Sequence, residues 1–210
     1  MLFRSHEKGD GTRGNGKAAA LRRGTMETRN QTPRVLFVLP VLGQPRHSKR
    51  IEMIRSGGAA VEAAAFDRDY HRGRLPDCQV TGLGTISHGR YLRRIPRILR
   101  ALRPLSRQIA RNDVVYAFGP DMALLSVLAR GASRTPVVME IGDLSRMQTR
   151  GGMVGHAVSA GERLLASRCG LVVTTTEAFM ENYYRRWLGV RTPGLVLENK
   201  IERSEEHTSE

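Results

Sequence analysis

The chain has 210 residues, of which 40% are hydrophobic and 26% are charged. These proportions are near the average for globular proteins, and they exclude a collagen-like, a disulfide-framework or a wholly disordered chain. The formal net charge is +14 and is carried mostly by arginine. Such a charge suits an anionic partner, but it describes association and solubility rather than fold or chemistry.

Three observations limit the cellular setting. The longest apolar run, Val35 to Leu42, is far shorter than the roughly 20 residues that a membrane-spanning helix needs. The two cysteines, Cys78 and Cys169, have neither metal-ligand spacing nor a pattern that argues a disulfide, which favours a reducing compartment and a cytoplasmic protein. A nucleic-acid partner is not expected, because an arginine excess also follows from a GC-rich genome.

Residues 1–32 lack hydrophobic periodicity and are expected to form a disordered basic leader. The spacing of Gly9, Gly11 and Gly14 matches a dinucleotide-binding fingerprint, and residues 11–17 nearly match a phosphate loop. Neither pattern follows a predicted strand, so we discard both. Either Met1 or Met26 can be the true start.

From residue 33 onward, short β-branched apolar runs alternate with longer helical stretches. Strands are expected at 35–39, 61–66, 79–83, 114–117, 137–141, 171–175 and 195–197. Helices are expected at 47–55, 91–111, 121–130, 155–167 and 177–187. This alternation predicts an α/β domain over residues 33–202, with a doubly wound, mostly parallel sheet of the Rossmann-like kind.

The loop after the first strand carries the first group of candidate site residues, since ligands of open α/β sheets bind beyond the carboxyl ends of the strands. A Gly/Pro turn opens a helix rich in basic side chains, and these residues are Gly43, Arg46, His47, Lys49 and Arg50. Free amides at a helix N-terminus beside such side chains suit phosphate or another anion. The alternative is that Gly43 only turns the chain and that the cations are solvated.

The loops after the fourth and fifth strands carry further candidates. Gly119 is a candidate for binding donor or acceptor, and Asp121 is expected to cap the next helix. Glu140 and Asp143 stand at the end of the fifth strand, where a turn at Gly142 can bring both carboxylates to the cleft. One of them could act as a base or bind substrate hydroxyls. For Asp143, an ordinary turn aspartate is the alternative.

Two later features are weaker. A threonine is expected to cap the helix that carries Glu177 near its start. The main interpretation of these residues is that they begin the helix, and the second is that they form a polar edge of the cleft. Asn199 lies where the periodic pattern ends. Residues 91–111 form a basic amphipathic segment that either packs on the sheet or lies on an anionic membrane surface, and Pro96 and Pro104 are expected to divide or kink it.

Taken in order, these pieces resemble the N-terminal domain of the retaining glycosyltransferases of the group 1, or family-four, class, which have a GT-B fold. The resemblance runs from about Pro33 to Ile201. It is carried by segments 34–38 with the Gly43 loop, 113–116, 136–143, 170–177 and 198–200. It implies transfer of a sugar from a nucleotide-sugar donor to a glycan or glycolipid acceptor, without an obligatory metal or other cofactor.

The resemblance also implies roles for individual residues. Gly43 would approach the donor phosphates or the transferred sugar, and Asp143 would lie at the acceptor or catalytic edge. Many relatives have a histidine just before this aspartate, whereas Gly142 stands there in this sequence. The family's N-terminal domain mainly binds acceptor, and its C-terminal domain, which binds the nucleotide sugar, has no counterpart in this sequence.

The last eight residues, 203–210, resemble a translated sequencing adapter, and they are expected to be a non-native or disordered tail. Under that interpretation the chain is a fragment of a longer enzyme for cell-surface polysaccharide or glycolipid synthesis. We expect such a fragment to be inactive alone and cytoplasmic, with peripheral contact at the inner membrane face left open as an alternative. Two alternatives stay open: a non-catalytic α/β domain that binds a phosphorylated or acidic ligand, and a nucleic-acid binder.

Overall fold

The computed structural model describes residues 32–67, 77–85, 91–142 and 152–198. Within these residues a single sheet holds seven parallel strands in the order β3-β2-β1-β4-β5-β6-β7. The strands are β1 (Arg34–Leu39), β2 (Ala60–Asp67), β3 (Gln79–Thr85), β4 (Val114–Phe118), β5 (Val137–Ile141), β6 (Leu171–Thr174) and β7 (Gly194–Val196). The doubly wound parallel sheet expected from the sequence is therefore confirmed.

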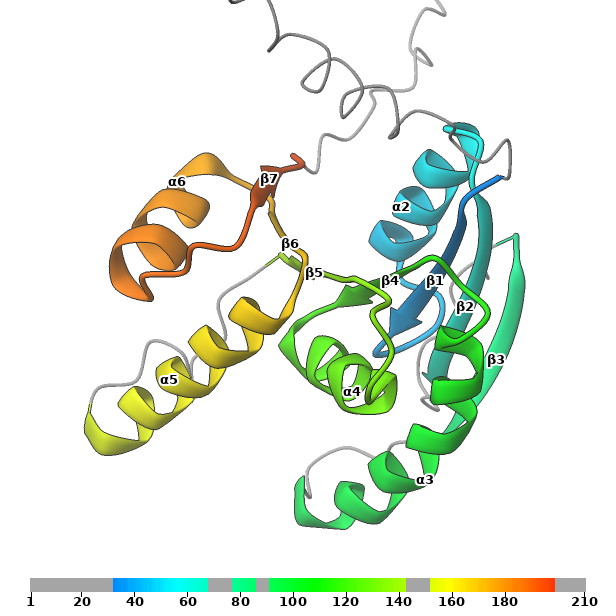
Figure 1. Cartoon of the computed structure of the whole chain (residues 1–210), viewed down its shortest axis with the longest axis horizontal. Helices are drawn as coiled ribbons and strands as arrows, with labels where there is room; N and C mark the ends of the chain where they lie inside the picture. The colour runs from blue at the N-terminus through cyan, green and yellow to red at the C-terminus, as the bar shows by residue number, and fades with distance from the viewer. Residues whose placement is uncertain (1–31, 68–76, 86–90, 143–151, 199–210) are drawn as a thin grey trace, which may run out of the picture. The chain divides into compact units, whose positions relative to one another are not determined.

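Helices connect most of the strands (Figure 1). They are α2 (Pro45–Ser56), α3 (Tyr91–Ile109), α4 (Pro120–Arg130), α5 (Gly152–Arg168), α6 (Glu177–Phe179) and the π-helix η1 (Met180–Trp187). Helix α2 begins with Pro45 at its first position, where the missing N–H costs no hydrogen bond. None of the helices in the described ranges is long and apolar enough to cross a bilayer.

Alternate residues of the central strands point to opposite faces of the sheet, so each face has its own core. On one face Phe37, Leu39, Tyr116 and Phe118 pack with Ile51 of α2. On the other face a larger cluster joins the strands to α3, α4, α5 and η1; its strand residues include Leu36, Val38, Ala117, Met139 and Ile141. Strands covered on both faces are apolar at nearly every position, which explains the continuous runs in the sequence.

Three local predictions need correction. Asp121 is not the helix cap, because α4 begins one residue earlier, with Gly119 as N-cap and Pro120 at the first position. Helix α3 continues through both Pro96 and Pro104, so the expected division is wrong, while the expected kink stays a prediction. The single helix expected over residues 177–187 changes at Met180 into the wider π-helical winding of η1.

The expected threonine cap is confirmed, since the hydroxyl of Thr176 accepts a hydrogen bond from the amide of Phe179 at 3.2 Å. The expected leader over residues 1–32, apart from Thr32, and the tail over residues 203–210 lie outside the described residues. So do two candidate site residues, Asp143 and Asn199.

Candidate functional site

The order of the strands fixes where a ligand is expected. Successive strands run from β1 outward to β3, and then the chain returns to place β4 on the other side of β1. In open α/β sheets the crevice at such a reversal, beyond the carboxyl ends of the strands, is where ligands bind. Gly43 follows β1 and Gly119 follows β4, with φ angles of 80° and 86° that favour glycine. The structure thus brings these two candidates to the same edge of the sheet, where this rule predicts the crevice.

A buried carboxylate anchors this end of the sheet. Glu140, the fourth residue of β5, has no exposed surface. Its two oxygens accept hydrogen bonds from Nε and Nη2 of Arg50, at 3.0 and 3.1 Å. The hydroxyl of Tyr116 on β4 donates a third bond at 2.6 Å. One carboxylate therefore joins helix α2 to strands β4 and β5. In this conformation the carboxylate is not open to a substrate.

The electrostatics of this cluster follow from its burial. Burial opposes the charged form of Arg50, but the hydrogen bonds and the charge of Glu140 outweigh it and raise the pKa of this guanidinium. Burial, together with the charge of Glu140, raises the pKa of Tyr116 well above its usual value, so its hydroxyl stays protonated and donates. The arrangement holds Arg50 and Glu140 as an ion pair.

Arg46 adds a second guanidinium, which is partly exposed. Its Nε lies 3.5 Å from Oε1 of Glu140, and 28% of its side chain is exposed. It lies 5.8 Å from the centre of the Phe118 ring. It also covers Gly142, where an added Cβ would stand 1.6 Å from Nη1 of Arg46. Among the described residues of this cluster, two guanidinium groups share one carboxylate, so one positive charge is in excess there, and Arg46 carries it on its partly exposed side chain.

His47 shapes the loop after β1 rather than adding charge. Its Nδ1 lies 3.3 Å from the carbonyl oxygen of Val41, and its ring stands 4.2 Å from that of Phe118. The pKa of His47 is lowered to about 4, chiefly by burial; the hydrogen bond to Val41 raises it, and the charge of Arg46 lowers it. The ring is neutral at pH 7 and donates from Nδ1, because a carbonyl oxygen can only accept.

The remaining sequence candidates lie outside this buried cluster. Lys49 is exposed on α2, and Glu177 is exposed in the first turn of α6. Sequence reasoning missed Tyr116, although a buried tyrosine and a buried glutamate each need a hydrogen-bonding partner. In the described ranges, no group of three or more His, Cys, Asp or Glu side chains could hold a metal ion.

Comparison with known proteins gives a family. Residues 48–200 match the family described as a glycosyl transferase 4-like domain. The chain is 31% identical over 175 residues to the succinoglycan biosynthesis protein ExoL of Rhizobium meliloti (strain 1021), and the match covers 80% of this chain and 43% of that protein. The chain thus spans less than half the length of the curated relative that it matches.

Solved structures share the fold at low identity. Sucrose-phosphate synthase from Thermosynechococcus elongatus superposes with a TM-score of 0.58 at 10% identity, covering 79% of this chain and 48% of that one. Anabaena Alr3699/HepE, solved in complex with UDP and glucose, gives 0.53 at 14% identity, with 79% and 44% covered. These likenesses confirm the expected fold, the Rossmann-like half of a GT-B glycosyltransferase.

Proposed function

Because this chain belongs to the family of glycosyl transferase 4-like domains, we propose that it is the acceptor-side half of a retaining glycosyltransferase. Its donor is a nucleotide sugar, and its acceptor is a growing cell-surface polysaccharide or a glycolipid at the cytoplasmic membrane face. The name of the curated relative, a succinoglycan biosynthesis protein, supports the polysaccharide. The UDP and glucose bound to Alr3699/HepE support a uridine diphosphate donor.

The observation that carries this proposal is the surplus positive charge of Arg46 at the strand-order reversal. When a sugar leaves its nucleotide, negative charge develops on the departing phosphate, and a fixed cation stabilises that charge most when it is already in place. The guanidinium of Arg46 is restrained by its ion pair with Glu140 on one side and by the Phe118 ring on another, and its buried Nε makes no hydrogen bond to a described residue. It is therefore oriented before a donor binds, at a small cost in side-chain entropy.

The other residues of the crevice act through position. Arg50 and Tyr116 hold Glu140, and Glu140 holds Arg46, so we assign Glu140 a positioning role. His47 fixes the loop that ends in Gly43, whose missing side chain leaves room for the transferred sugar or its phosphate. Asp143 remains the candidate for contact with the acceptor hydroxyl.

Catalysis in this proposal requires a second domain, because one wall of a crevice cannot surround a transition state. The test joins this chain to the C-terminal portion of the succinoglycan relative and measures glucose transfer from UDP-glucose to a membrane-extracted glycolipid acceptor. Transfer by the fused protein, its loss in Arg46→Gln and its survival in Arg134→Gln are expected. Arg134 is an exposed arginine away from the crevice.

Two results would count against the proposal. Donor-dependent transfer by the 210-residue chain alone would remove the need for a second domain. Binding of phosphate compounds by the isolated chain, without transfer by any fusion, would favour the alternative of a non-catalytic domain for a phosphorylated ligand. The anomeric configuration of the product, measured by NMR, tests retention separately.

A further inference from the structure

A second basic site lies at the opposite edge of the sheet. A pocket of about 830 Å³ is lined by Arg163, Ser167, Arg185, Gly189, Val190 and Arg191. Ser167 is in the last turn of α5, just before β6, and residues 189–191 lead into β7. The pocket therefore lies beside the starts of β6 and β7, whereas the Arg46 crevice lies beyond the ends of β1, β4 and β5.

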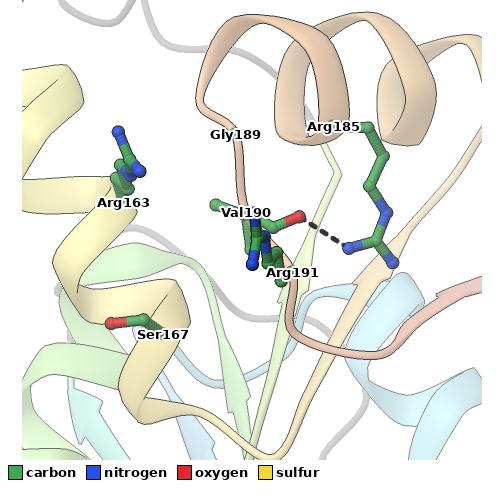
Figure 2. Close-up of a pocket in the computed structure, with 6 residues that line it drawn as sticks. All are labelled: Arg163, Ser167, Arg185, Gly189, Val190 and Arg191. Atoms are coloured by element: carbon green, nitrogen blue, oxygen red, sulfur yellow. Dashed lines mark hydrogen bonds between the residues drawn. The ribbon is translucent and has the colours of Figure 1, made fainter.

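Figure 2 shows how two parts of the chain form the pocket. Arg163 and Ser167 project from α5 on one side. Arg185 of η1 reaches toward the connection to β7 on the other, where its Nη1 donates to the carbonyl oxygens of Val190 and Thr192, both at 2.7 Å. Gly189, with a φ of 63°, makes the turn that brings this connection back. The position of Arg185 is thus fixed by backbone contacts rather than by a carboxylate.

The side chains that line this pocket are basic or uncharged. Within the part of the chain that the structure describes, no acidic residue is among them. The ion pairs found among the described residues engage Arg46, Arg50 and Arg55, not the arginines of the pocket. The nearby carboxylate of Glu162 is buried and accepts bonds from the hydroxyls of Tyr183 and Tyr184.

Several polar groups beside the pocket are already paired within the protein. The carbonyl of Ala166 near the end of α5 accepts from the hydroxyl of Thr192 at 2.8 Å and from the amide of Cys169 at 3.1 Å. The hydroxyl of Ser167 donates to the carbonyl of Leu164 at 2.7 Å. The free hydrogen-bonding capacity of the pocket is therefore mostly that of guanidinium donors, which pair well with phosphate oxygens.

From this geometry we propose that the pocket between α5 and the η1–β7 connection is a binding site for a phosphate-bearing ligand. Its volume is in the range of small-molecule sites. Three guanidinium groups from two chain segments suit a ligand with more than one negative charge, such as a pyrophosphate group or clustered lipid phosphates. The site is separate from the Arg46 crevice, so the inference stands whether or not the proposed sugar transfer is correct.

The test uses the 210-residue chain and two probes that share this chemistry. Isothermal titration calorimetry at low salt measures binding of inorganic pyrophosphate, and co-sedimentation measures binding to phosphatidylglycerol vesicles against phosphatidylcholine vesicles. The double variant Arg163→Gln/Arg191→Gln removes two cations from the pocket. The matched control Arg111→Gln/Arg134→Gln removes two exposed cations elsewhere, so both variants have the same net charge.

We expect the pocket variant to weaken binding about tenfold or more, as loss of charge-assisted hydrogen bonds should, while the control changes it much less. Pyrophosphate binding with this pattern identifies a free phosphorylated ligand. Vesicle binding with this pattern, without pyrophosphate binding, identifies lipid phosphates. Equal weakening by both variants, or no binding of either probe, would overturn the proposal. Thermal melting shows whether each variant is folded. If the double variant does not fold, the single variant Arg191→Gln replaces it in the binding measurements, because Arg191 is an exposed residue of the connection.

Discussion

The ion pair inside the crevice makes a quantitative prediction about stability. Replacing Arg50 by Met keeps much of its packing volume but leaves the carboxylate of Glu140, which has no exposed surface, with only Tyr116 and the 3.5 Å contact to Arg46. Breaking a buried pair by removing one partner costs about 3–5 kcal/mol. Arg50→Met should therefore lower the free energy of unfolding by about that amount.

A double-mutant cycle isolates the interaction. The double variant Arg50→Met/Glu140→Gln removes both charges, so it should be less destabilised than the sum of the single variants, by about 1–3 kcal/mol. Urea unfolding followed by circular dichroism gives all four free energies. Arg55→Met on the same helix is the control, since its partners Asp77 and Glu52 are exposed, and it should cost far less. Additive single effects, or equal losses for Arg50 and Arg55, would refute the buried-pair reasoning.

Other predictions concern the loop, the crevice and a helix start. The pKa of His47 is lowered from 6.5 in the unfolded chain to about 4 in the folded chain, so the unfolded chain binds more protons between these pH values. The free energy of unfolding should therefore fall as the pH is lowered from 6.5 toward 4. In urea titrations across this range, His47→Gln should show a decrease that is smaller by about 3 kcal/mol. Gly142→Ala should push the guanidinium of Arg46 from its place and reduce transfer by the fused enzyme about tenfold, with unchanged folding by circular dichroism. Thr176→Val should lower the unfolding free energy by about 1 kcal/mol through loss of the cap, whereas Thr176→Ser should not.

The sheet could be predicted because its strands are covered on both faces. After Arg34, β1 is an unbroken apolar run, and β5 is apolar except for Glu140; the structure places both strands within one residue of the expected bounds. The winding and the exact start of the helices were harder to predict. The pattern over residues 177–187 indicates a helix, but nothing in that pattern distinguishes ordinary winding from the π-helix η1. Asp121 was a plausible cap by composition, yet the fixed φ of Pro120 sets the helix start one residue earlier.

The candidate site was predictable only in part. In parallel sheets, ligands bind beyond the carboxyl ends of the strands. This rule predicted the loop after the first strand as part of the site, and with it Gly43, Arg46 and His47. The partners of Glu140 could not be found this way. Arg50 is 90 positions away and Tyr116 is 24, and their meeting depends on β4 lying between β1 and β5. Because that order is a property of the whole sheet, a carboxylate that suggested acid-base chemistry in the sequence is an internal ion-pair partner in the fold.

The two basic sites differ in how their charge is held, and this difference predicts how each responds to salt. At the crevice, Arg50 is paired inside the protein and Arg46 is only partly exposed, so screening acts weakly on their arrangement. At the pocket, Arg163 and Arg191 are exposed and no carboxylate lines the site, so attraction for an anion should fall steeply as ionic strength rises. Affinity for an anion should therefore fall more steeply with ionic strength at the pocket than at the crevice.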